Sequence, residues 1–150
     1  MGDEHAPKTY RHGPLRRTVN RMMLAFARAG LVPSSAILTT RGRRSGEPRR
    51  TPVTPIEVGG RHWLVAPYGE VAWVRNVRDH PEITLTRGRH ERRYALRAAT
   101  PDEAGPVLRR YVEVAPIVLP YFTAHRGDPV ESFVAEAGRH PVFELLPAAG

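Results

Sequence analysis

Four arginines and two glycines fall within nine consecutive residues, GRRSGEPRR, at positions 42–50. Arginine carries a planar guanidinium group whose N–H donors suit phosphate and carboxylate groups. Glycine adopts positive φ and lets backbone N–H groups face an anion, and Ser45 adds a hydroxyl donor. These residue types predict an anion site in a loop, and a solvated basic turn is the alternative that composition leaves open. The charges of the predicted site are Arg43, Arg44, Arg49 and Arg50.

The segment differs from two well-known catalytic loops. The GxxxxGK[ST] pattern of nucleotide-binding P-loops is absent, and no helical pattern follows the glycines. The GxSxG pattern of a nucleophile elbow is also missing around Ser45. The sequence therefore predicts neither a P-loop nucleotide hydrolase nor a serine hydrolase.

Other protein-based chemistry has little support in the sequence. There is no cysteine, and the seven histidines form no HxxxH or HExxH pair. The carboxylates are isolated, so no acid–base dyad is visible. We expect no metal site. Hydride transfer remains compatible with such a chain, because a cofactor carries the reactive atom and the protein orients it.

Composition indicates one soluble domain. The 150 residues are 41% hydrophobic, carry a net charge of +8, and contain no long apolar run or apolar leader. We expect a cytoplasmic protein with a flexible segment at 1–13 and a single domain at 14–150. The charge favours anionic partners. However, only Lys8 among the 23 basic residues is lysine, and such arginine enrichment is also typical of GC-rich genomes.

Periodicity predicts the secondary structure. Apolar residues at helical spacing indicate a basic amphipathic helix from Pro14 to Gly30. Strand patterns follow, with a hairpin at Gly59-Gly60 and a second hairpin, ITLTRGRHERRYALRAA, that turns near Gly88. The first strands are expected at Ile37–Thr40, Val53–Val58 and the RHWLV run after the glycines.

The remaining elements alternate irregularly with these strands. Five or six strands without βαβ alternation predict a small antiparallel α+β barrel rather than a Rossmann fold. The expected elements are a helix at Val71–Asp79, a helix from Pro101 to about Tyr111, a broken apolar segment at Val114–Phe122, a helix at Pro129–Ala137 and a strand in HPVFELLP.

The order of several motifs resembles a known family. LTTRGRRSGEPRRTPV, then the Gly-Gly hairpin, then VAPYGEVAWVRNVRDHP, covers roughly residues 36–100. The pattern is similar to that of the deazaflavin-dependent nitroreductase family. Members of that family are small split-β-barrel proteins with flanking helices, and they use coenzyme F-420. The resemblance implies F-420 as the cofactor, with FMN as the alternative because the same barrel architecture carries FMN elsewhere.

The resemblance also implies roles for individual residues. The arginine loop would hold the coenzyme's phosphate and acidic tail, and the strand at Thr51 and the Y-G turn would border the deazaflavin ring. The cofactor-binding residues implied are Arg43, Arg44, Ser45, Gly46, Arg49, Thr51, Pro52, Val53, Ala66, Pro67, Tyr68, Gly69, Trp73 and Asn76. For Trp73, a core position is the alternative, and for Asn76 the alternative is a cap or a bridge to backbone.

The sequence also departs from the family pattern. Only three residues, Glu70, Val71 and Ala72, separate the Y-G turn from Trp73, which is fewer than in well-studied members. Family members present tyrosines from the C-terminal region to the substrate, and Tyr111 and Tyr121 are the candidates here. As catalytic proton donors we predict Tyr68, Tyr121 and His125.

The resemblance implies an oxidoreductase that transfers a hydride from reduced F-420 to a quinone, an enone or a nitroarene. The alternative is a non-catalytic binder of an anionic flavin-like or lipid-like ligand, or an FMN-dependent reductase. Nucleic acid is not an expected partner, because exposed aromatic residues for base stacking are scarce beside the arginine clusters. A homodimer is compatible with a split barrel.

Overall fold

A computed structural model describes residues 35–148. The segment predicted as flexible, 1–13, and the helix predicted at 14–30 lie outside the described residues. The described part contains seven strands: β1 (Ala36–Arg41), β2 (Pro48–Val53), β3 (Ile56–Val58), β4 (Arg61–Val65), β5 (Glu82–Arg87), β6 (His90–Ala98) and β7 (Val142–Pro147). It also contains the helices α2 (Ala72–Asp79), α3 (Pro101–Val114) and α4 (Val130–Val134), with a short 3-10 helix, η1 (Pro116–Tyr121).

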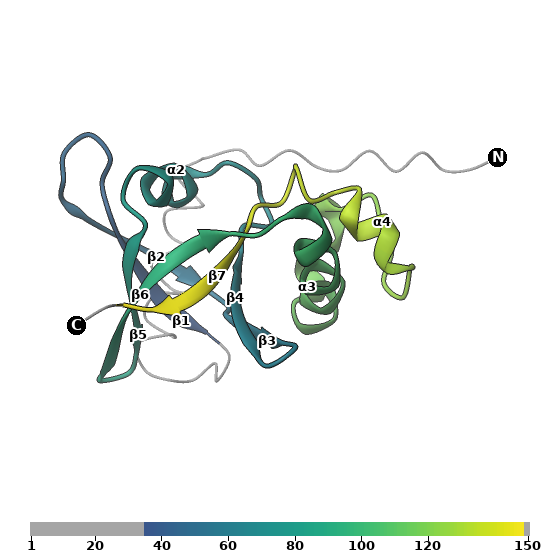
Figure 1. Ribbon diagram of the computed structural model, residues 1–150, viewed down its shortest axis with the longest axis horizontal. Helices are drawn as coiled ribbons and strands as arrows, with labels where there is room; N and C mark the ends of the chain where they lie inside the picture. The colour runs from purple at the N-terminus through teal and green to yellow at the C-terminus, as the bar shows by residue number, and fades with distance from the viewer. Residues whose placement is uncertain (1–34, 149–150) are drawn as a thin grey trace.

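The strands form one antiparallel sheet in the order β2-β1-β5-β6-β7-β4-β3. The sheet curls into a half-barrel, with α2 at one end, α3 beside β3 and β4, and α4 packed against α3 (Figure 1). This is the split-barrel α+β architecture that the sequence predicts. Both predicted hairpins are confirmed, because β3 pairs with β4 across Gly59-Gly60 and β5 pairs with β6 around Gly88.

One predicted strand is wrong. The run Val53–Val58 was expected to be continuous, but β2 ends at Val53 and β3 begins at Ile56. These two strands lie at opposite edges of the sheet, so the chain must cross between them. Pro55 lies in this crossing, where its missing N–H costs no ladder hydrogen bond. The break raises the number of strands to seven.

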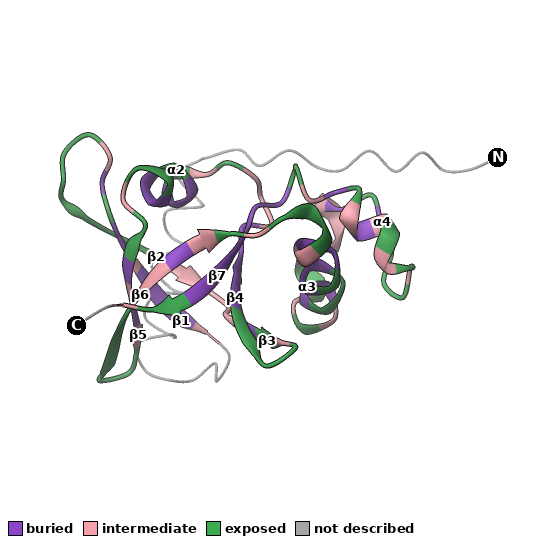
Figure 2. Ribbon diagram, viewed as in Figure 1, coloured by how far each residue is buried: buried purple, intermediate pink, exposed green. Residues whose placement is uncertain are grey.

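The sheet carries a different apolar cluster on each face. Figure 2 shows buried residues along the central strands and on α2 and α3. On the concave face, α2 places Trp73, Val74 and Val77 against Leu38 and Phe143. On the other face of the β3-β4-β7 edge, the C-terminal helices form a second cluster. Its members include Trp63, Val65, Leu108, Tyr111, Phe122 and Phe133.

Helix α3 begins where the sequence predicts and ends three residues later than expected, at Val114. Thr100 accepts a hydrogen bond from the Glu103 backbone N–H, and the Glu103 side chain accepts one from the Thr100 N–H, which completes a capping box. The predicted helix at Pro129–Ala137 is shorter in the structure, as α4 covers only Val130–Val134.

Candidate functional site

The arginine-rich segment forms the loop between β1 and β2, and two glycines fix its shape. The backbone N–H of Gly42 donates to the Glu47 carbonyl at 2.8 Å, and that of Gly46 donates to the Gly42 carbonyl at 2.8 Å. Gly46 has φ of +73°, which an L side chain rarely adopts. A Cβ on Gly42 would lie 2.8 Å from Ser45 Oγ. The loop therefore requires glycine at position 46, and a side chain at position 42 would displace the Ser45 hydroxyl.

Asn76 fastens this loop to α2. Its side chain is buried, with only 4% of the residue exposed. Its Oδ1 accepts a hydrogen bond from the Arg43 backbone N–H at 3.2 Å, and its Nδ2 donates to Thr40 Oγ1 at 3.1 Å. Asn76 thus bridges to backbone, as one reading of the sequence anticipated, and the segment it bridges to is the arginine loop itself.

A hollow of about 370 Å³ lies between the loop, β2 and the start of α2. Seven of the predicted cofactor-binding residues line it: Arg43, Arg44, Ser45, Arg49, Thr51, Trp73 and Asn76. Gly42, Arg50 and Ala72 complete the described lining. Residues that are up to 34 positions apart in the sequence thus meet at one site.

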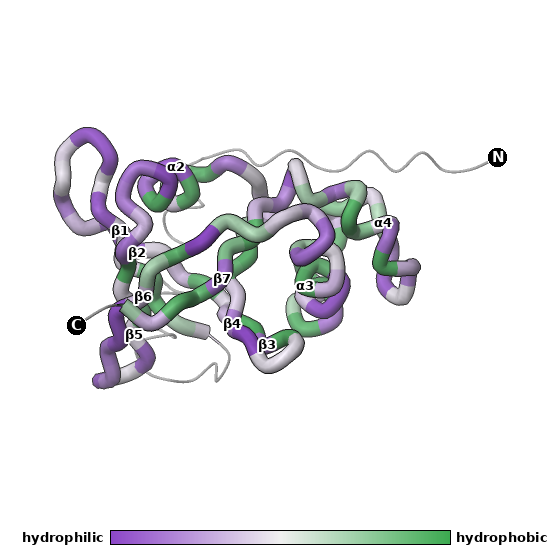
Figure 3. The backbone as a smooth tube through the Cα atoms, viewed as in Figure 1, coloured by the Kyte–Doolittle hydropathy of each residue, from purple (hydrophilic) through white to green (hydrophobic). Residues whose placement is uncertain are grey.

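The hollow is strongly cationic. Arg43 is half-buried, and Arg44, Arg49 and Arg50 are exposed. None of these four side chains makes an ion pair with a carboxylate of residues 35–148. The loop and its charges form the hydrophilic extension at the upper left of Figure 3. Phosphate or carboxylate groups would neutralise this charge and use its N–H donors.

Trp73 belongs to both the core and the site. It is 6% exposed and packs against Phe143, with 5.8 Å between ring centroids. It also lines the hollow beside the arginines. Its removal would therefore affect folding and change the shape of the hollow.

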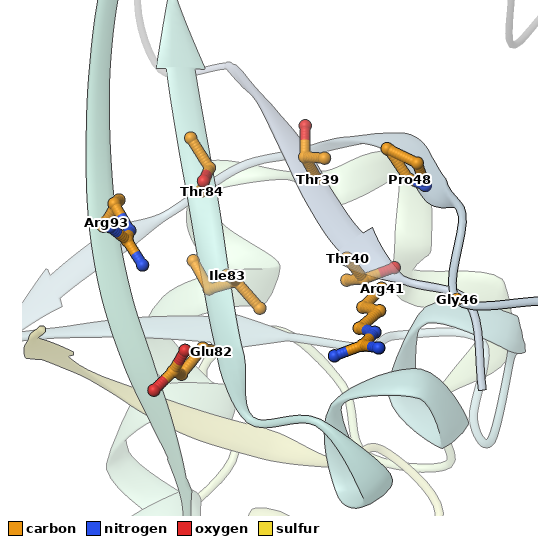
Figure 4. A pocket seen from close by; sticks show the side chains of 9 residues that line it. All are labelled: Thr39, Thr40, Arg41, Gly46, Pro48, Glu82, Ile83, Thr84 and Arg93. Carbon is orange, nitrogen blue, oxygen red and sulfur yellow. The ribbon is translucent and has the colours of Figure 1, made fainter.

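A second, smaller hollow of about 230 Å³ lies on the other side of the loop, against β1, β5 and β6 (Figure 4). The predicted residue Gly46 lines this hollow, together with Arg41, Glu82 and Arg93. Because Glu82 offsets part of the charge, this hollow is less cationic than the first.

Four other predicted residues, Ala66, Pro67, Tyr68 and Gly69, form the turn after β4. Gly69 has φ of +94°, and its N–H donates to the Ala66 carbonyl at 3.2 Å. The Ala66 N–H donates to the Pro141 carbonyl at 2.8 Å. Tyr68 contacts Tyr121 edge to face, with 4.7 Å between ring centroids. The structure thus brings together two of the three predicted proton donors.

His125, the third predicted proton donor, lies apart from that pair in the turn after η1. Its side chain is 75% exposed, and its Nδ1 is 3.9 Å from Asp128 Oδ2.

Pro52 and Val53 continue along β2 from the first hollow, and Val53 packs against the concave core. Tyr111 is buried under Tyr68, and burial raises the pKa of its hydroxyl.

A buried pair behind the Tyr68 turn was missed from the sequence. His140 Nδ1 donates to the Pro67 carbonyl at 2.7 Å, and its ring stacks on Phe122. Glu136 accepts hydrogen bonds from the backbone N–H groups of Thr123 and Ala124. Burial lowers the pKa of His140. The i, i+4 spacing of Glu136 and His140 was the available signal, but that spacing is common in surface helices.

A charge network on the outer face of the sheet was also missed. Glu144, whose side chain is 7% exposed, accepts hydrogen bonds from Arg61 Nη2 at 2.7 Å and from Arg97 Nη2 at 2.9 Å. Arg97 Nη2 also donates to Glu103 Oε2 at 2.7 Å. The arginine partners lower the pKa of both carboxyl groups, that of Glu103 to about 2. These partners lie 6 to 83 positions apart, so periodicity could not reveal them.

Two features are absent from residues 35–148. No group of three or more His, Asp or Glu side chains there could hold a metal ion. No helix in that range is long and apolar enough to cross a membrane.

Comparison with protein families identifies the family of the chain. A model of the F420H(2)-dependent quinone reductase family matches residues 15–126, well over half of the chain. The chain belongs to this family. Coenzyme F-420 is therefore its cofactor, and oxidoreduction is its reaction class. The cationic hollow fits such a cofactor, since its arginines lack acidic partners in the described chain. FMN, the alternative left open by the sequence, is not the cofactor for which the family is named.

Solved structures share the fold at low sequence identity. A structure described as an F420-H2 dependent reductase, FDR-A, aligns with a TM-score of 0.53 and 23% identity, covering 75% of this chain and 93% of its own. An F420 reductase aligns at 0.51 and 15%, covering 78% and 88%. The heme storage protein HutZ from Vibrio cholerae aligns at 0.54 and 10%, covering 87% and 90%. No curated protein matches the chain.

Proposed function

We propose that this family member transfers a hydride from reduced coenzyme F-420 to an activated acceptor, namely a quinone, an enone or a nitroarene. The observation that supports this most is the hollow at the β1–β2 loop, which four arginines surround without a carboxylate partner in residues 35–148. Maintaining such a cluster costs electrostatic free energy. An anionic ligand recovers that energy.

The loop residues would hold the phosphate and the acidic tail of the coenzyme. Arg43, Arg44 and Arg49 supply guanidinium groups and Ser45 supplies a hydroxyl. Gly46, whose N–H donates to the Gly42 carbonyl, supplies the positive φ that shapes the loop. The bonds of Gly42 and Asn76 fix the loop before the ligand arrives. Such preorganisation reduces the entropy cost of binding.

The ring would lie between β2 and the turn after β4. Thr51 lines the hollow, and Pro52 and Val53 continue the same strand away from the arginines. We assign the opposite border to Ala66, Pro67, Tyr68 and Gly69, with Trp73 and Asn76 at the floor near the loop. His140 and the Pro141 carbonyl hold this turn in place.

Bound F-420 supplies the hydride, so the protein needs no nucleophile of its own. The side chains orient the acceptor, exclude water and provide a proton. Tyr68 and Tyr121 are the better-placed proton donors because their rings are in contact beside the proposed groove. His125 is much more exposed, and we assign it the smallest role of the three.

The test is oxidation of reduced F-420 by menadione, followed by its returning absorbance. We expect turnover with reduced F-420 and none with reduced nicotinamide, because the sequence carries no dinucleotide fingerprint. Tyr68→Phe and Tyr121→Phe keep the ring contact and remove one hydroxyl each, so loss of turnover with intact binding identifies the donor. Binding without turnover of quinones, enones and nitroarenes would favour the carrier alternative. A folded protein that fails to bind F-420 would contradict the proposal.

A further inference from the structure

The second arginine-rich segment of the chain, in the β5–β6 hairpin, lies at the opposite end of the half-barrel from the β1–β2 arginine loop. β1 runs antiparallel to β5, with Thr39 opposite Thr84 and Ile37 opposite Thr86. The β1–β2 loop therefore leaves one end of the half-barrel, and the β5–β6 turn leaves the other (Figure 1). Figure 3 shows both as hydrophilic extensions of the sheet.

A hollow of about 400 Å³ lies at this second end. Its volume is within the range of roughly 300–1,000 Å³ that is usual for small-molecule sites. Apolar or aromatic side chains form one part of its lining, and basic side chains form the other. The described lining residues are Pro55, His62, Leu85, Arg87, His90, Arg92, Tyr94, Leu145 and Pro147.

Strand register explains how both kinds of side chain reach one hollow. Residues opposite each other in an antiparallel pair share a face, and side chains two positions apart share it too. Leu85 is opposite Arg92, and Arg87 is opposite His90, so all four face the same side. Leu85 belongs to the concave core. The basic residues of the hairpin therefore occupy core-facing positions beyond the point where the apolar core ends.

The same change occurs on β4, which β7 separates from β6 in the sheet. Leu64 is in the concave core, and His62, two residues earlier, lines the hollow. Leu85 and Leu145, at its apolar side, are each 7% exposed. On β4, β5 and β6, the core-facing side chains thus change from apolar to basic at the same end of the half-barrel.

The basic side chains have no acidic partner in the described structure. Neither arginine nor either histidine makes an ion pair with a carboxylate of residues 35–148, and no described carboxylate lines the hollow. Glu57 is opposite His62 in the β3–β4 pair, but it does not line the hollow. The site combines an apolar floor with an unneutralised cationic rim.

We propose that this end of the half-barrel binds a small apolar molecule that carries one carboxylate, such as a medium-chain fatty acid. The apolar body would cover Leu85, Leu145 and Tyr94, and the carboxylate would accept hydrogen bonds from Arg87 and Arg92. A phosphodiester chain fits less well, because it would leave the apolar floor exposed. This site is additional to the proposed cofactor site and does not depend on it.

Isothermal titration of the full-length protein with octanoate and with octanol tests the proposal. The two probes share an apolar chain and differ in the charged group. Charge-assisted hydrogen bonds make octanoate bind roughly tenfold or more tightly than octanol. Equal affinities, or no octanoate binding at millimolar concentration, would overturn the proposal.

The hairpin offers a closely matched control. Arg87→Gln/Arg92→Gln removes the two arginines that line the hollow and abolishes the preference for octanoate. Arg89→Gln/Arg93→Gln removes the same charge from the same hairpin, but Arg89 lies in the turn and Arg93 lines the hollow on the other face. This second variant retains the preference, and both variants bind F-420 normally. Equal octanoate binding by the two variants would overturn the assignment.

Light scattering on the same samples separates a ligand site from a subunit interface. The proposal predicts that the association state is the same for the wild type and for Arg87→Gln/Arg92→Gln. A dimer that octanoate does not affect, and that this variant dissociates, would overturn the proposal in favour of an interface between copies.

Discussion

The arginines of the β1–β2 loop and the arginines beside Glu144 carry the same charge in opposite surroundings. Arg61 and Arg97 share the carboxylates of Glu144 and Glu103. Arg43, Arg44, Arg49 and Arg50 have no acidic partner within residues 35–148 and instead surround a hollow. In an arginine-rich chain, the presence or absence of a carboxylate partner thus separates structural arginines from candidates for ligand binding.

The largest effect should come from the loop arginines. Replacement of Arg43 and Arg44 by alanine should weaken F-420 binding by about 1–3 kcal/mol for each charge-assisted hydrogen bond that the substitution removes. Because these side chains have no partner in the described fold, the free energy of unfolding should change by less than about 0.5 kcal/mol. Fluorescence titration and urea unfolding of the same variant measure the two effects. A decrease in stability equal to the decrease in binding would show that these arginines are structural.

Asn76 should couple folding to binding. Asn76→Ala leaves the Arg43 backbone N–H and the Thr40 hydroxyl without their described partner. We expect a loss of about 1–3 kcal/mol in the free energy of unfolding, because buried polar groups then lack hydrogen bonds. F-420 binding should weaken as well, because the loop loses its link to α2. Normal binding by a destabilised variant would mean that the loop keeps its shape without Asn76.

The charge network around Glu144 should affect stability and not F-420 binding, which is the reverse of the effect expected for the loop arginines. Glu144→Gln keeps the shape of the side chain and removes its charge. The expected loss in the free energy of unfolding is about 1–2 kcal/mol, a moderate value because Arg61 and Arg97 are partly exposed. F-420 affinity should not change. Weakened F-420 binding with unchanged stability would remove the distinction between the two arginine groups.

The smallest effect should be an acid sensitivity that is specific to the network. Folding lowers the pKa of Glu103 and Glu144 below 4.5, so both carboxylates stabilise the fold above that pH. That stability is lost as the pH falls from 4.5 toward 2. Burial lowers the pKa of His140 below 6.5, which makes the fold less stable at acid pH in the wild type and in Glu144→Gln alike.

The difference in stability between the wild type and Glu144→Gln therefore isolates the contribution of the Glu144 carboxylate. In urea unfolding from pH 7 to pH 3, the stability gap between the wild type and Glu144→Gln should narrow only below about pH 4.5. A gap that stays constant to pH 3 would show that Glu144 contributes little through its charge.

The sequence predicted local structure better than long-range contacts. Alternating apolar residues and Gly59-Gly60 predicted the first hairpin, and the Thr100–Glu103 capping box supports the predicted start of α3. The strand at Val53–Val58 was misjudged because its composition does not show that its halves join opposite edges of the sheet.

The candidate site shows the same contrast between local features, which the sequence predicted, and long-range contacts, which it did not. The arginine loop was predictable, because its charges and glycines are neighbours in the chain. The link from Asn76 to Arg43 spans 33 positions, and that from Arg61 to Glu144 spans 83. Residue types alone could not show which arginine meets a carboxylate, because that depends on how the strands are ordered in the sheet.

The central claim is that the loop arginines lack carboxylate partners because they bind the anionic part of coenzyme F-420. The most direct measurement compares wild-type affinity for intact F-420 with that for the deazaflavin shortened by its phosphate and acidic tail, at low and at high salt. We expect intact F-420 to bind more tightly, and we expect high salt to remove most of the difference. Equal, salt-insensitive affinities for the two molecules would contradict it.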